Sequence, residues 1–580
     1  MAPPRPEIRY QKVKDHQGEE EEEEDEVTIY LYSHQSSPII RERYRETCLR
    51  IFSSILLLMV AAGFVLYDLQ FRNTEAPATP LAFQVHIDES LNSNLSGVPS
   101  SQSSHEELEE SHHQHHHDSQ TSGNELSSSS HHHSEGTFHQ AVAVTDSEKC
   151  SMLARDVLQS GGSVVDAGIS AVLCLVVVHP HTSSLGGVFS SIFFSSTSQN
   201  ASILNAMPTE ASPVSYGVPQ VLQGLWVLHR KYGKKPWAQL VNSSANLADN
   251  GFLVDSSLHA ALLANRDKIL SSDGLCSLFC DPHQTLKDVG ERIENPVLGK
   301  VLEQIGRSMS GPKLPDDLIH SLMDDIGVKE VEKFRELSSK HMTIENPLTL
   351  HLDTLTLFTT AGPTAGKILA NSIQKIHDKK NSQTLQSASE LLLNSSKMAY
   401  TMGGAWPTDL TTNSSVQLPP WNPAPVGANV MIANTYGDIF VLSLTLNSSF
   451  GSGFVSSSTG ILLSDFLQGQ SSMESPLYWA CPSVLIYGAD NDVMGLSAYG
   501  GSSGPFSLSQ VIISHLVLEM DLTESVTGSL VKVPAEISDP WMEYFGLQDN
   551  GTEPVLAVEV QAEHVHVMKS HGSCCYPKGL

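Results

Sequence analysis

The sequence predicts an α+β fold, a layered sandwich of helices and antiparallel strands, in the part of the chain that begins near Phe138. Three observations lead to this prediction. Helical stretches come first, two β-hairpins follow within residues 430–446 and 484–498, and helical spacing returns at Ser507–Met520. Helices, then antiparallel strands, then helices are an element order typical of layered α+β domains.

Two polar stretches set the limits of this folded part. Residues 19–26 are eight consecutive acids, and residues 99–135 are almost entirely Ser, His, Glu and Gln. The remainder is long enough for one large core or two moderate ones, which argues against a peptide hormone or a simple adaptor. The net charge of −30 argues against a nucleic-acid partner, because few cations are left to neutralise phosphates. Eight cysteines in 580 residues are too few for a disulfide scaffold.

Residues 1–50 are predicted to be an acidic cytoplasmic tail, and residues 51–67 a transmembrane anchor without charge. The anchor's seventeen residues reach about 26 Å as a helix, just short of a hydrocarbon core of about 30 Å. A cleavable signal peptide is the rival interpretation, but it would lie at the extreme N-terminus. Only Arg72 follows the span closely, whereas four arginines precede it: Arg41, Arg43, Arg45 and Arg50. The positive-inside rule therefore predicts a single-pass type II membrane protein with its C-terminal part extracellular or luminal, in contact with lipid through residues 51–67.

Residues 73–137 are predicted to be a disordered stalk, because they are rich in Ser and His and poor in aromatic residues. Its histidine tracts can bind Zn²⁺ or Cu²⁺ adventitiously, but they lack thiolates and a fixed geometry. We therefore predict no metal site and no cofactor, and metal storage stays a minor hypothesis. Sequons beyond the span predict N-glycosylation at Asn94, Asn200, Asn242, Asn394, Asn413 and Asn550.

The folded part opens with helical spacing at Met152–Gln159, and Gly161 and Gly162 are typical of a helix end. Val164–Val178 is apolar on nearly every side and too short to span a bilayer, which predicts a central buried helix ended by Pro180. A turn at 181–187 leads into a strand. The predicted strands are Val188–Phe194, Val430–Ala433, Ile439–Leu446, Val484–Tyr487 and Val493–Ala498, and two further predicted helices are Gly217–Tyr232 and Trp237–Asp249.

Several motifs within residues 138–570 occur in an order and at spacings that together resemble a known family. They are Gly161-Gly-Ser-Val-Val-Asp166, Leu185-Gly-Gly187, Tyr232-Gly-Lys-Lys-Pro-Trp237, Asn447, Phe450-Gly-Ser452, Gly460-Ile-Leu-Leu463, Cys481-Pro482 and Gly500-Gly501. This series resembles the γ-glutamyltransferases, also called glutathione hydrolases. The resemblance implies disulfides between Cys150 and Cys174 and between Cys276 and Cys280.

The resemblance also implies a four-layer αββα sandwich of the N-terminal-nucleophile hydrolase type. Members of this family cut their own chain before a threonine, whose hydroxyl then attacks the γ-glutamyl amide of glutathione and its conjugates. The acyl-enzyme passes to water or to an amine. By this resemblance, residues 138–426 are like the large subunit and residues 427–580 are like the small subunit.

The position that matches the family nucleophile is Gly427, within Pro425-Val-Gly-Ala-Asn-Val430. Glycine has no side chain, so it can neither attack a substrate nor initiate self-cleavage. The nearby hydroxyls belong to Thr411 and Thr412, which lie upstream, and to Thr435, which lies in the following turn. No small shift in register supplies a nucleophile.

The residues that bind substrate in the family also differ here. Met207 stands where an arginine would hold the glutamyl α-carboxylate, and Met cannot form that bidentate bond. The places of the ammonium-binding acids match Phe466 and Gly469, with only Asp465 nearby, and Tyr478 and Trp479 replace paired serines.

Some substrate-side positions of the family are retained. Period-two alternation predicts Thr445 and Asn447 on one strand face, and Gly500 and Gly501 match the backbone donors of an oxyanion hole. These four residues are the candidate substrate-binding positions, although each also has a purely structural interpretation. Asn447 belongs to a sequon too, but we expect its burial to spare it from glycosylation.

Two functional hypotheses remain. The first is a membrane-anchored glutathione hydrolase or γ-glutamyltransferase that uses a non-standard nucleophile. The second is a noncatalytic family member that stays a single chain and acts as a binding or assembly protein for an unknown partner. The glycine at position 427 and the methionine at position 207 favour the second.

Overall fold

A computed structural model describes residues 136–208, 215–308, 315–327, 335–336, 342–353, 355–379, 385–402, 427–466, 478–528, 531, 541, 545, 547, 554–570 and 575–580. All of them lie in one unit, Glu125–Leu580. The predicted acidic tail, the anchor at 51–67 and the stalk up to residue 135 lie outside the described residues. Within the described part of the chain, no helix is both long enough and apolar enough to cross a bilayer.

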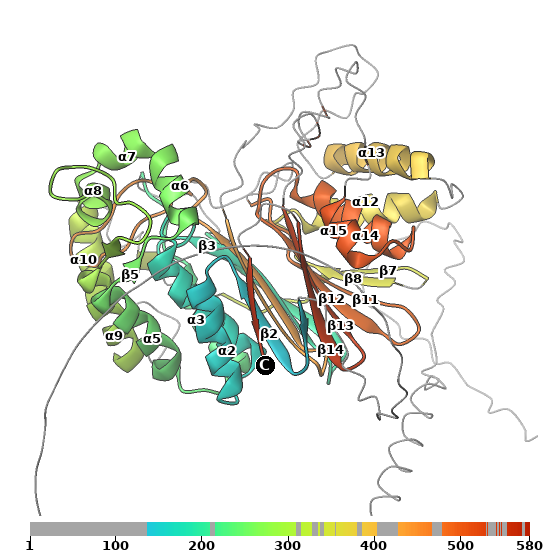
Figure 1. Ribbon diagram of the computed structural model, residues 1–580, viewed down its shortest axis with the longest axis horizontal. Helices are drawn as coiled ribbons and strands as arrows, with labels where there is room; N and C mark the ends of the chain where they lie inside the picture. The colour runs from blue at the N-terminus through green and yellow to red at the C-terminus, as the bar shows by residue number, and fades with distance from the viewer. Residues whose placement is uncertain are drawn as a thin grey trace, which may run out of the picture. The chain divides into compact units, whose positions relative to one another are not determined.

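The predicted α+β class is confirmed by two antiparallel sheets that pack against each other, with helices on both outer faces (Figure 1). The six-stranded sheet has the order β15 (Tyr576–Gly579), β2 (Ala141–Thr145), β9 (Ala428–Asn434), β10 (Ile439–Thr445), β3 (Val188–Ser195) and β4 (Asn200–Ala206). The seven-stranded sheet has the order β1 (Thr137–Phe138), β14 (His564–Lys569), β13 (Val555–Gln561), β12 (Asp492–Ala498), β11 (Ser483–Tyr487), β8 (Leu355–Thr359) and β7 (Leu348–His351).

Nine described helices and a small hairpin accompany the six-stranded sheet. They are α2 (Glu148–Gln159), α3 (Val164–Val178), α4 (Val221–Tyr232), α5 (Trp237–Asn250), α6 (Ser256–Ala264), α7 (Arg266–Leu270), α8 (Asp273–Phe279), α9 (Pro296–Ser308) and α10 (Asp316–Ile326), with β5 (Phe252–Leu253) and β6 (Arg292–Ile293). The seven-stranded sheet is covered by α12 (Gly366–Asp378), α13 (Leu385–Met402), α14 (Gly504–Leu516) and α15 (Leu522–Thr527).

Three apolar cores separate these layers. One lies between the six-stranded sheet and its helices, a second lies between the two sheets, and a third lies between the seven-stranded sheet and α12–α15. Both sheets contain strands from residues 138–426 and from residues 427–580. The two subunit-like regions of the sequence are therefore interleaved, and a cut between them would leave one folded body.

The predicted central helix is confirmed, because every residue of α3 is buried. Its first turn is fixed by Asp166, whose Oδ2 accepts hydrogen bonds from the backbone N–H groups of Ser163, Lys234 and Lys235 at 2.9, 2.9 and 3.2 Å. The Ser163 hydroxyl donates to the Tyr232 carbonyl at 3.1 Å. Two of the sequence motifs, 161–166 and 232–237, thus form one structural joint.

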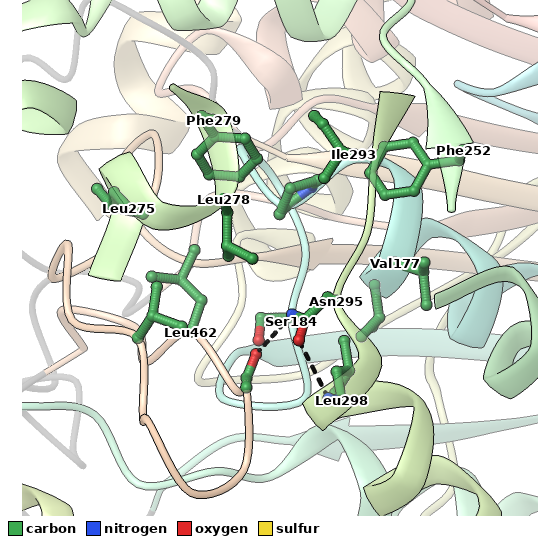
Figure 2. Close-up of a pocket in the computed structure, with 14 residues that line it drawn as sticks. Val177, Ser184, Phe252, Leu275, Leu278, Phe279, Ile293, Asn295, Leu298 and Leu462 are labelled. Carbon is green, nitrogen blue, oxygen red and sulfur yellow. Dashed lines mark hydrogen bonds between the residues drawn. The ribbon is translucent and has the colours of Figure 1, made fainter. Parts of the chain in front are cut away.

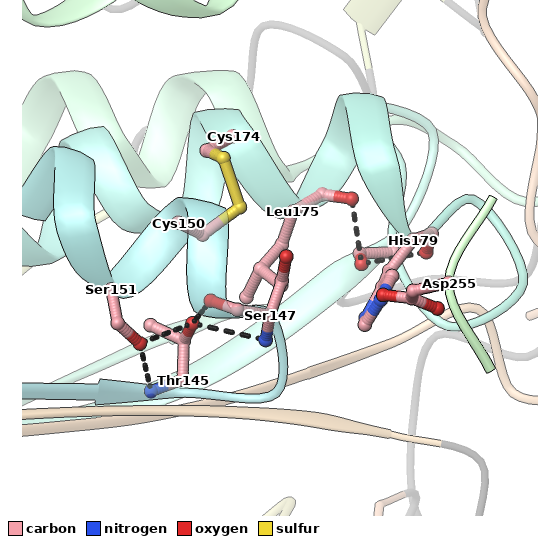
Figure 3. The surroundings of a disulfide bond; sticks show 9 residues. Thr145, Ser147, Cys150, Ser151, Cys174, Leu175, His179 and Asp255 are labelled. Carbon is pink, nitrogen blue, oxygen red and sulfur yellow. Dashed lines mark hydrogen bonds and ion pairs between the residues drawn. A yellow bond between two sulfur atoms is a disulfide. The ribbon is translucent and has the colours of Figure 1, made fainter. Parts of the chain in front are cut away.

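Both disulfides implied by the sequence are present, Cys150–Cys174 and Cys276–Cys280. Figure 3 shows that the first joins α2 to α3 above the end of β2. At this end of β2, the hydroxyl of Ser151 accepts a hydrogen bond from the Thr145 backbone N–H at 3.0 Å. The bridge and these hydrogen bonds hold α2 and α3 in place on the six-stranded sheet.

Some predicted boundaries are corrected by the structure. The helix predicted from Gly217 begins at Val221, and the helix predicted to reach Met520 ends at Leu516. The helix α2 starts at Glu148 and is capped by Ser160, with Gly161 just beyond at φ +87°. Both predicted hairpins are confirmed, as β9–β10 and β11–β12.

The joint at Asp166 makes a prediction about stability. Replacing Asp166, whose side chain is buried, by Ala leaves three partly buried or exposed backbone N–H donors without their acceptor, so we expect the free energy of unfolding to fall by about 1–3 kcal/mol. Denaturant unfolding of the purified protein measures this change. The matched control is Asp156→Ala in α2, since Asp156 is half exposed and pairs with Arg155 on the surface. A loss as small as that of the control would contradict the role given to Asp166.

Candidate functional site

Gly427, the position predicted from the motifs to match the family nucleophile, is buried at one end of the six-stranded sheet. It immediately precedes β9, next to the pair formed by Ala428 and Leu444. A side chain here would meet its neighbours at once. A Cβ would overlap the carbonyl oxygen of Tyr499 and lie 3.1 Å from the hydroxyl of Tyr478. The space that a nucleophile would need is therefore occupied.

The Tyr478 ring also closes the other side of this position. Gly500 has φ +88°, and a Cβ on it would lie 2.5 Å from a Tyr478 ring carbon. Tyr478 itself is only 4% exposed. The Tyr478 side chain thus lies against Gly427 through its hydroxyl and against Gly500 through its ring, the predicted nucleophile position and one of the two predicted oxyanion-hole positions.

Three of the positions predicted to differ from the family's substrate-binding residues, Met207, Phe466 and Tyr478, come together in one small cluster, which we name the apolar plug. It consists of Val188, Met207, Phe466, Tyr478 and Ala480, all buried. The rings of Phe466 and Tyr478 meet edge to face, with centroids 6.5 Å apart. Burying a charged amino-acid head group among such side chains costs several kcal/mol without charged or hydrogen-bonding partners. The plug has the wrong chemistry for a γ-glutamyl carboxylate or ammonium.

Asp465 does not supply a free negative charge for a substrate ammonium, because its carboxylate is hydrogen-bonded within the protein. One oxygen accepts from the Ser448 backbone N–H at 3.2 Å and the other from the Ser448 hydroxyl at 2.6 Å. Lys268 is engaged in the same turn, where its Nζ donates to the carbonyls of Ser449 and Gly451. Burial lowers the pKa of Lys268, and the charge of Asp465 opposes this shift in part. These charges hold the turn after β10.

Trp479, the second of the paired-serine positions, faces another part of the molecule. Its ring stacks on Tyr400 of α13 with centroids 5.7 Å apart, and it packs against the core under α12–α15. Neighbouring residues in extended chain point in opposite directions. Tyr478 therefore fills the plug while Trp479 anchors the outer helical layer.

The prediction that Thr445 and Asn447 share a strand face is wrong. The strand β10 ends at Thr445, which is 2% exposed, and Asn447 has φ +77° and is exposed. The Asn447 backbone N–H donates to the Thr445 hydroxyl at 2.9 Å, which turns the chain out of the sheet. The expectation that burial spares Asn447 from glycosylation loses its basis, because the residue is not buried.

A buried polar network that the sequence did not predict lies between the sheets beside Gly427. The Asn429 Oδ1 accepts from the hydroxyls of Ser443 and Ser497, each at 2.7 Å. The carboxylate of Asp146 accepts from the Asn429 backbone N–H at 2.9 Å and from the Tyr499 hydroxyl at 2.6 Å. The only sequence signal was a polar residue at inward-facing strand positions.

The opposite end of α3 carries a second group of titratable residues. The His179 Nε2 lies 2.6 Å from the Asp255 Oδ2, as Figure 3 shows. Burial raises the pKa of Asp255, but the hydrogen bond and charge of His179 outweigh it and lower the pKa overall. Burial also holds the pKa of His181 well below its usual range. The His181 carbonyl accepts from the Phe450 N–H at 3.0 Å, so this group fixes the turn after β10.

Two hollows lie elsewhere in the described structure. Figure 2 shows one that is lined mainly by apolar side chains of α3, α8 and the 460–463 segment, with Ser184 and Asn295 as its polar residues. Its volume of about 20 Å³ has room for little more than one water. A larger cavity of about 290 Å³ lies among α12, α13 and α14, and Gly427 does not line it. Among the described residues, no cluster of His, Cys, Asp and Glu suits a metal ion.

The comparisons with known proteins agree with the resemblance drawn from the motifs. A family model described as Gamma-glutamyltranspeptidase matches residues 150–215 and 205–419, and so stops short of Gly427. Glutathione hydrolase 6 of Mus musculus is 32% identical over 446 residues, which cover 76% of this chain and 78% of that protein. Glutathione hydrolase 6 of Rattus norvegicus is 30% identical over 531 residues, or 91% of this chain and 87% of that one.

A solved structure of another protein has a similar fold. The crystal structure of cephalosporin acylase from Bacillus halodurans matches with a TM-score of 0.61 and 14% identity, over 79% of this chain and 99% of that chain. At this identity the likeness concerns the fold alone. It is consistent with the two packed sheets and the two helical layers described above.

The closed surroundings of Gly427 make a prediction about restoring the nucleophile. The substitution Gly427→Thr should not start self-cleavage, and the added side chain should cost about 1–3 kcal/mol of stability through overpacking. Gel electrophoresis of the purified variant and its denaturant unfolding measure the two effects. Gly427→Thr combined with Tyr478→Ser is the matched variant, because it removes the Tyr478 ring and leaves the Tyr499 carbonyl oxygen, the atom nearest to a Cβ at position 427, as the remaining obstacle. Appearance of a fragment beginning at position 427 in the single variant would contradict the prediction.

Proposed function

Because this chain belongs to the γ-glutamyltranspeptidase family, we propose that it keeps the family scaffold without the family reaction and acts as a binding or assembly protein. The observation that carries this proposal is the contact of Tyr478 with both Gly427 and Gly500. The family reaction, cleavage of the γ-glutamyl bond of glutathione and its conjugates, needs a hydroxyl where this chain has a glycine. It also needs space for the substrate where this chain has a tyrosine ring.

No neighbouring hydroxyl of the described residues can serve as the nucleophile in place of position 427. Thr435 follows the far end of β9, and eight residues of extended chain separate it from Gly427 by about 26 Å. The hydroxyls of Ser443 and Ser497 already donate to Asn429 inside the sheet-to-sheet core. Thr445 is buried and accepts from the Asn447 backbone. Thr411 and Thr412 lie outside the described residues.

The alternative is an active glutathione hydrolase or γ-glutamyltransferase with a non-standard nucleophile. Cys575 is the described side chain that best suits it, because its sulfur lies 2.9 Å from the Tyr499 hydroxyl and 3.8 Å from the Asp146 carboxylate. That network reaches β9 through the Asn429 backbone. The thiol is fully buried, however, and a nucleophile must meet its substrate.

We further propose that the chain is a type II membrane protein whose residues 51–67 anchor it and whose residues 73–135 form a stalk, since Thr137, the predicted end of the stalk, belongs to β1. The folded part would then lie in an extracellular or luminal space. Two disulfides support an oxidising compartment. The exposed side chain of Asn200 supports N-glycosylation on that side. Asn242 and Asn394 are exposed too, but they lie within helices. The predicted sites at Asn94, Asn413 and Asn550 lie outside the described residues.

The proposal predicts a single uncut chain without hydrolase activity. On a reducing gel, the purified protein should migrate as one piece, with no band for residues 427–580. Incubation with a γ-glutamyl p-nitroanilide should release no p-nitroaniline above the level of the buffer, with an active family member as the positive control. Glutathione should not raise the melting temperature, because the plug leaves its charged groups without partners.

Measurements on the same samples distinguish the two candidate functions. An active alternative would release p-nitroaniline, and the substitution Cys575→Ser would abolish that release if the thiol were the nucleophile. Release that survives this substitution would contradict both the noncatalytic proposal and the role of Cys575.

A further inference from the structure

Asn447 combines three properties that the family-derived role as a substrate residue does not explain. Its side chain is exposed, and within the described part of the chain the side-chain carboxamide of Asn447 has no hydrogen-bond partner. Its backbone is left-handed, at φ +77°, a conformation that Asn tolerates better than most residues. It also begins a sequon, Asn447-Ser448-Ser449, in an irregular turn at the surface.

The other sequons in the described residues differ in their local structure. Asn242 and Asn394 lie within helices, and the hydroxyl residues that complete their sequons, Ser244 and Ser396, are buried. Asn200 begins β4 after an exposed turn, and its Ser202 is partly exposed. Ser449 is likewise partly exposed. Sequons in surface turns are the ones that carry glycans in folded secreted proteins.

The position of Asn447 relates this sequon to the closed site. Gly427 lies beside the end of β10, and Asn447 follows that end by two residues, at the same edge of the sheet. An open pocket at this edge would have to admit substrate past any sugar attached there. In this chain Tyr478 and the rest of the apolar plug already fill the pocket. A bulky group at the edge therefore displaces no ligand.

We propose that Asn447 carries an N-linked oligosaccharide, which stands at the edge of the filled pocket. In the transfer, the amide Nδ2 of Asn447 forms a bond to the anomeric carbon of a lipid-diphosphate-linked oligosaccharide. The bond from that carbon to the diphosphate oxygen breaks, the lipid diphosphate leaves, and the amide nitrogen gives up one proton. This inference rests on the proposed topology, because the transfer needs the folded part to enter the secretory lumen.

The test uses the full chain, expressed in cells that glycosylate secreted proteins. The purified protein is treated with the amidase that removes N-glycans and converts the bearing Asn to Asp, and its peptides are read by mass spectrometry. We expect conversion at Asn447 and at Asn200. Asn447→Asp should remove one glycan from the intact protein, because it eliminates the acceptor amide and keeps a side chain that tolerates the left-handed backbone.

A second pair of variants separates glycosylation from folding. Ser449→Ala destroys the sequon and leaves Asn447 in place, but it also removes the hydroxyl that accepts from the Asn265 side chain at 3.2 Å. Ser449→Thr keeps both the sequon and a hydroxyl. We expect the glycan at Asn447 to disappear only in Ser449→Ala, with both variants secreted or retained at the membrane as the parent is. A glycan at Asn200 without one at Asn447 would overturn this inference alone. Absence of glycan at both positions would instead overturn the proposed topology.

Discussion

The packing of the Tyr478 ring against two glycines is the constraint on which the rest of this site depends. The ring occupies the volume between the start of β9 and the turn after β12, and both Gly427 and Gly500 leave room for it by having no Cβ. Protein interiors are close-packed, so such a volume cannot hold a ring and a second side chain together. The absence of a side chain at position 427 and the presence of the ring at position 478 are thus two parts of one packing arrangement.

The apolar plug places further buried side chains at the positions predicted for substrate recognition. Met207 comes from the end of β4, Phe466 from the segment after the 460–463 motif, and Tyr478 from the approach to β11. Each replaces a polar or charged residue of the family pattern, and all of them are buried in the same cluster. Three such side chains that meet at the positions predicted for substrate contacts are consistent with a filled pocket. Independent loss of charges at an unused site would leave gaps or unpaired polar groups there.

Sequence reasoning predicted the parts of this molecule that depend on local patterns. The apolar run Val164–Val178 gave a buried helix, and the two hairpins and two disulfides were found where they were expected. The strands β13 and β14 were missed although His564–Lys569 alternates, because Val555–Gln561 begins with four apolar residues and the turn at Ala562-Glu563 contains no Gly, Pro, Asn or Asp. The face of Asn447 was predicted wrongly, since alternation cannot show where a strand ends. The plug and the Asn429 network join distant segments, and a pattern in one segment contains no information about such contacts.

The structure also shows that the motifs that carry the resemblance have roles in the scaffold. Asp166, in the 161–166 motif, accepts hydrogen bonds from the backbone N–H groups of Lys234 and Lys235 in the 232–237 motif. The Gly186 carbonyl, in the 185–187 motif, accepts from the Ser464 N–H at 3.1 Å, directly after the 460–463 motif. These motifs hold helices and turns to the six-stranded sheet, which is a structural role that requires no reaction. At the positions predicted for the nucleophile and for two substrate contacts, this chain has Gly427, Met207 and Tyr478, and all three are buried within the scaffold. A family assignment that rests on the motifs therefore reports the scaffold, and the reaction has to be judged from the side chains around Gly427.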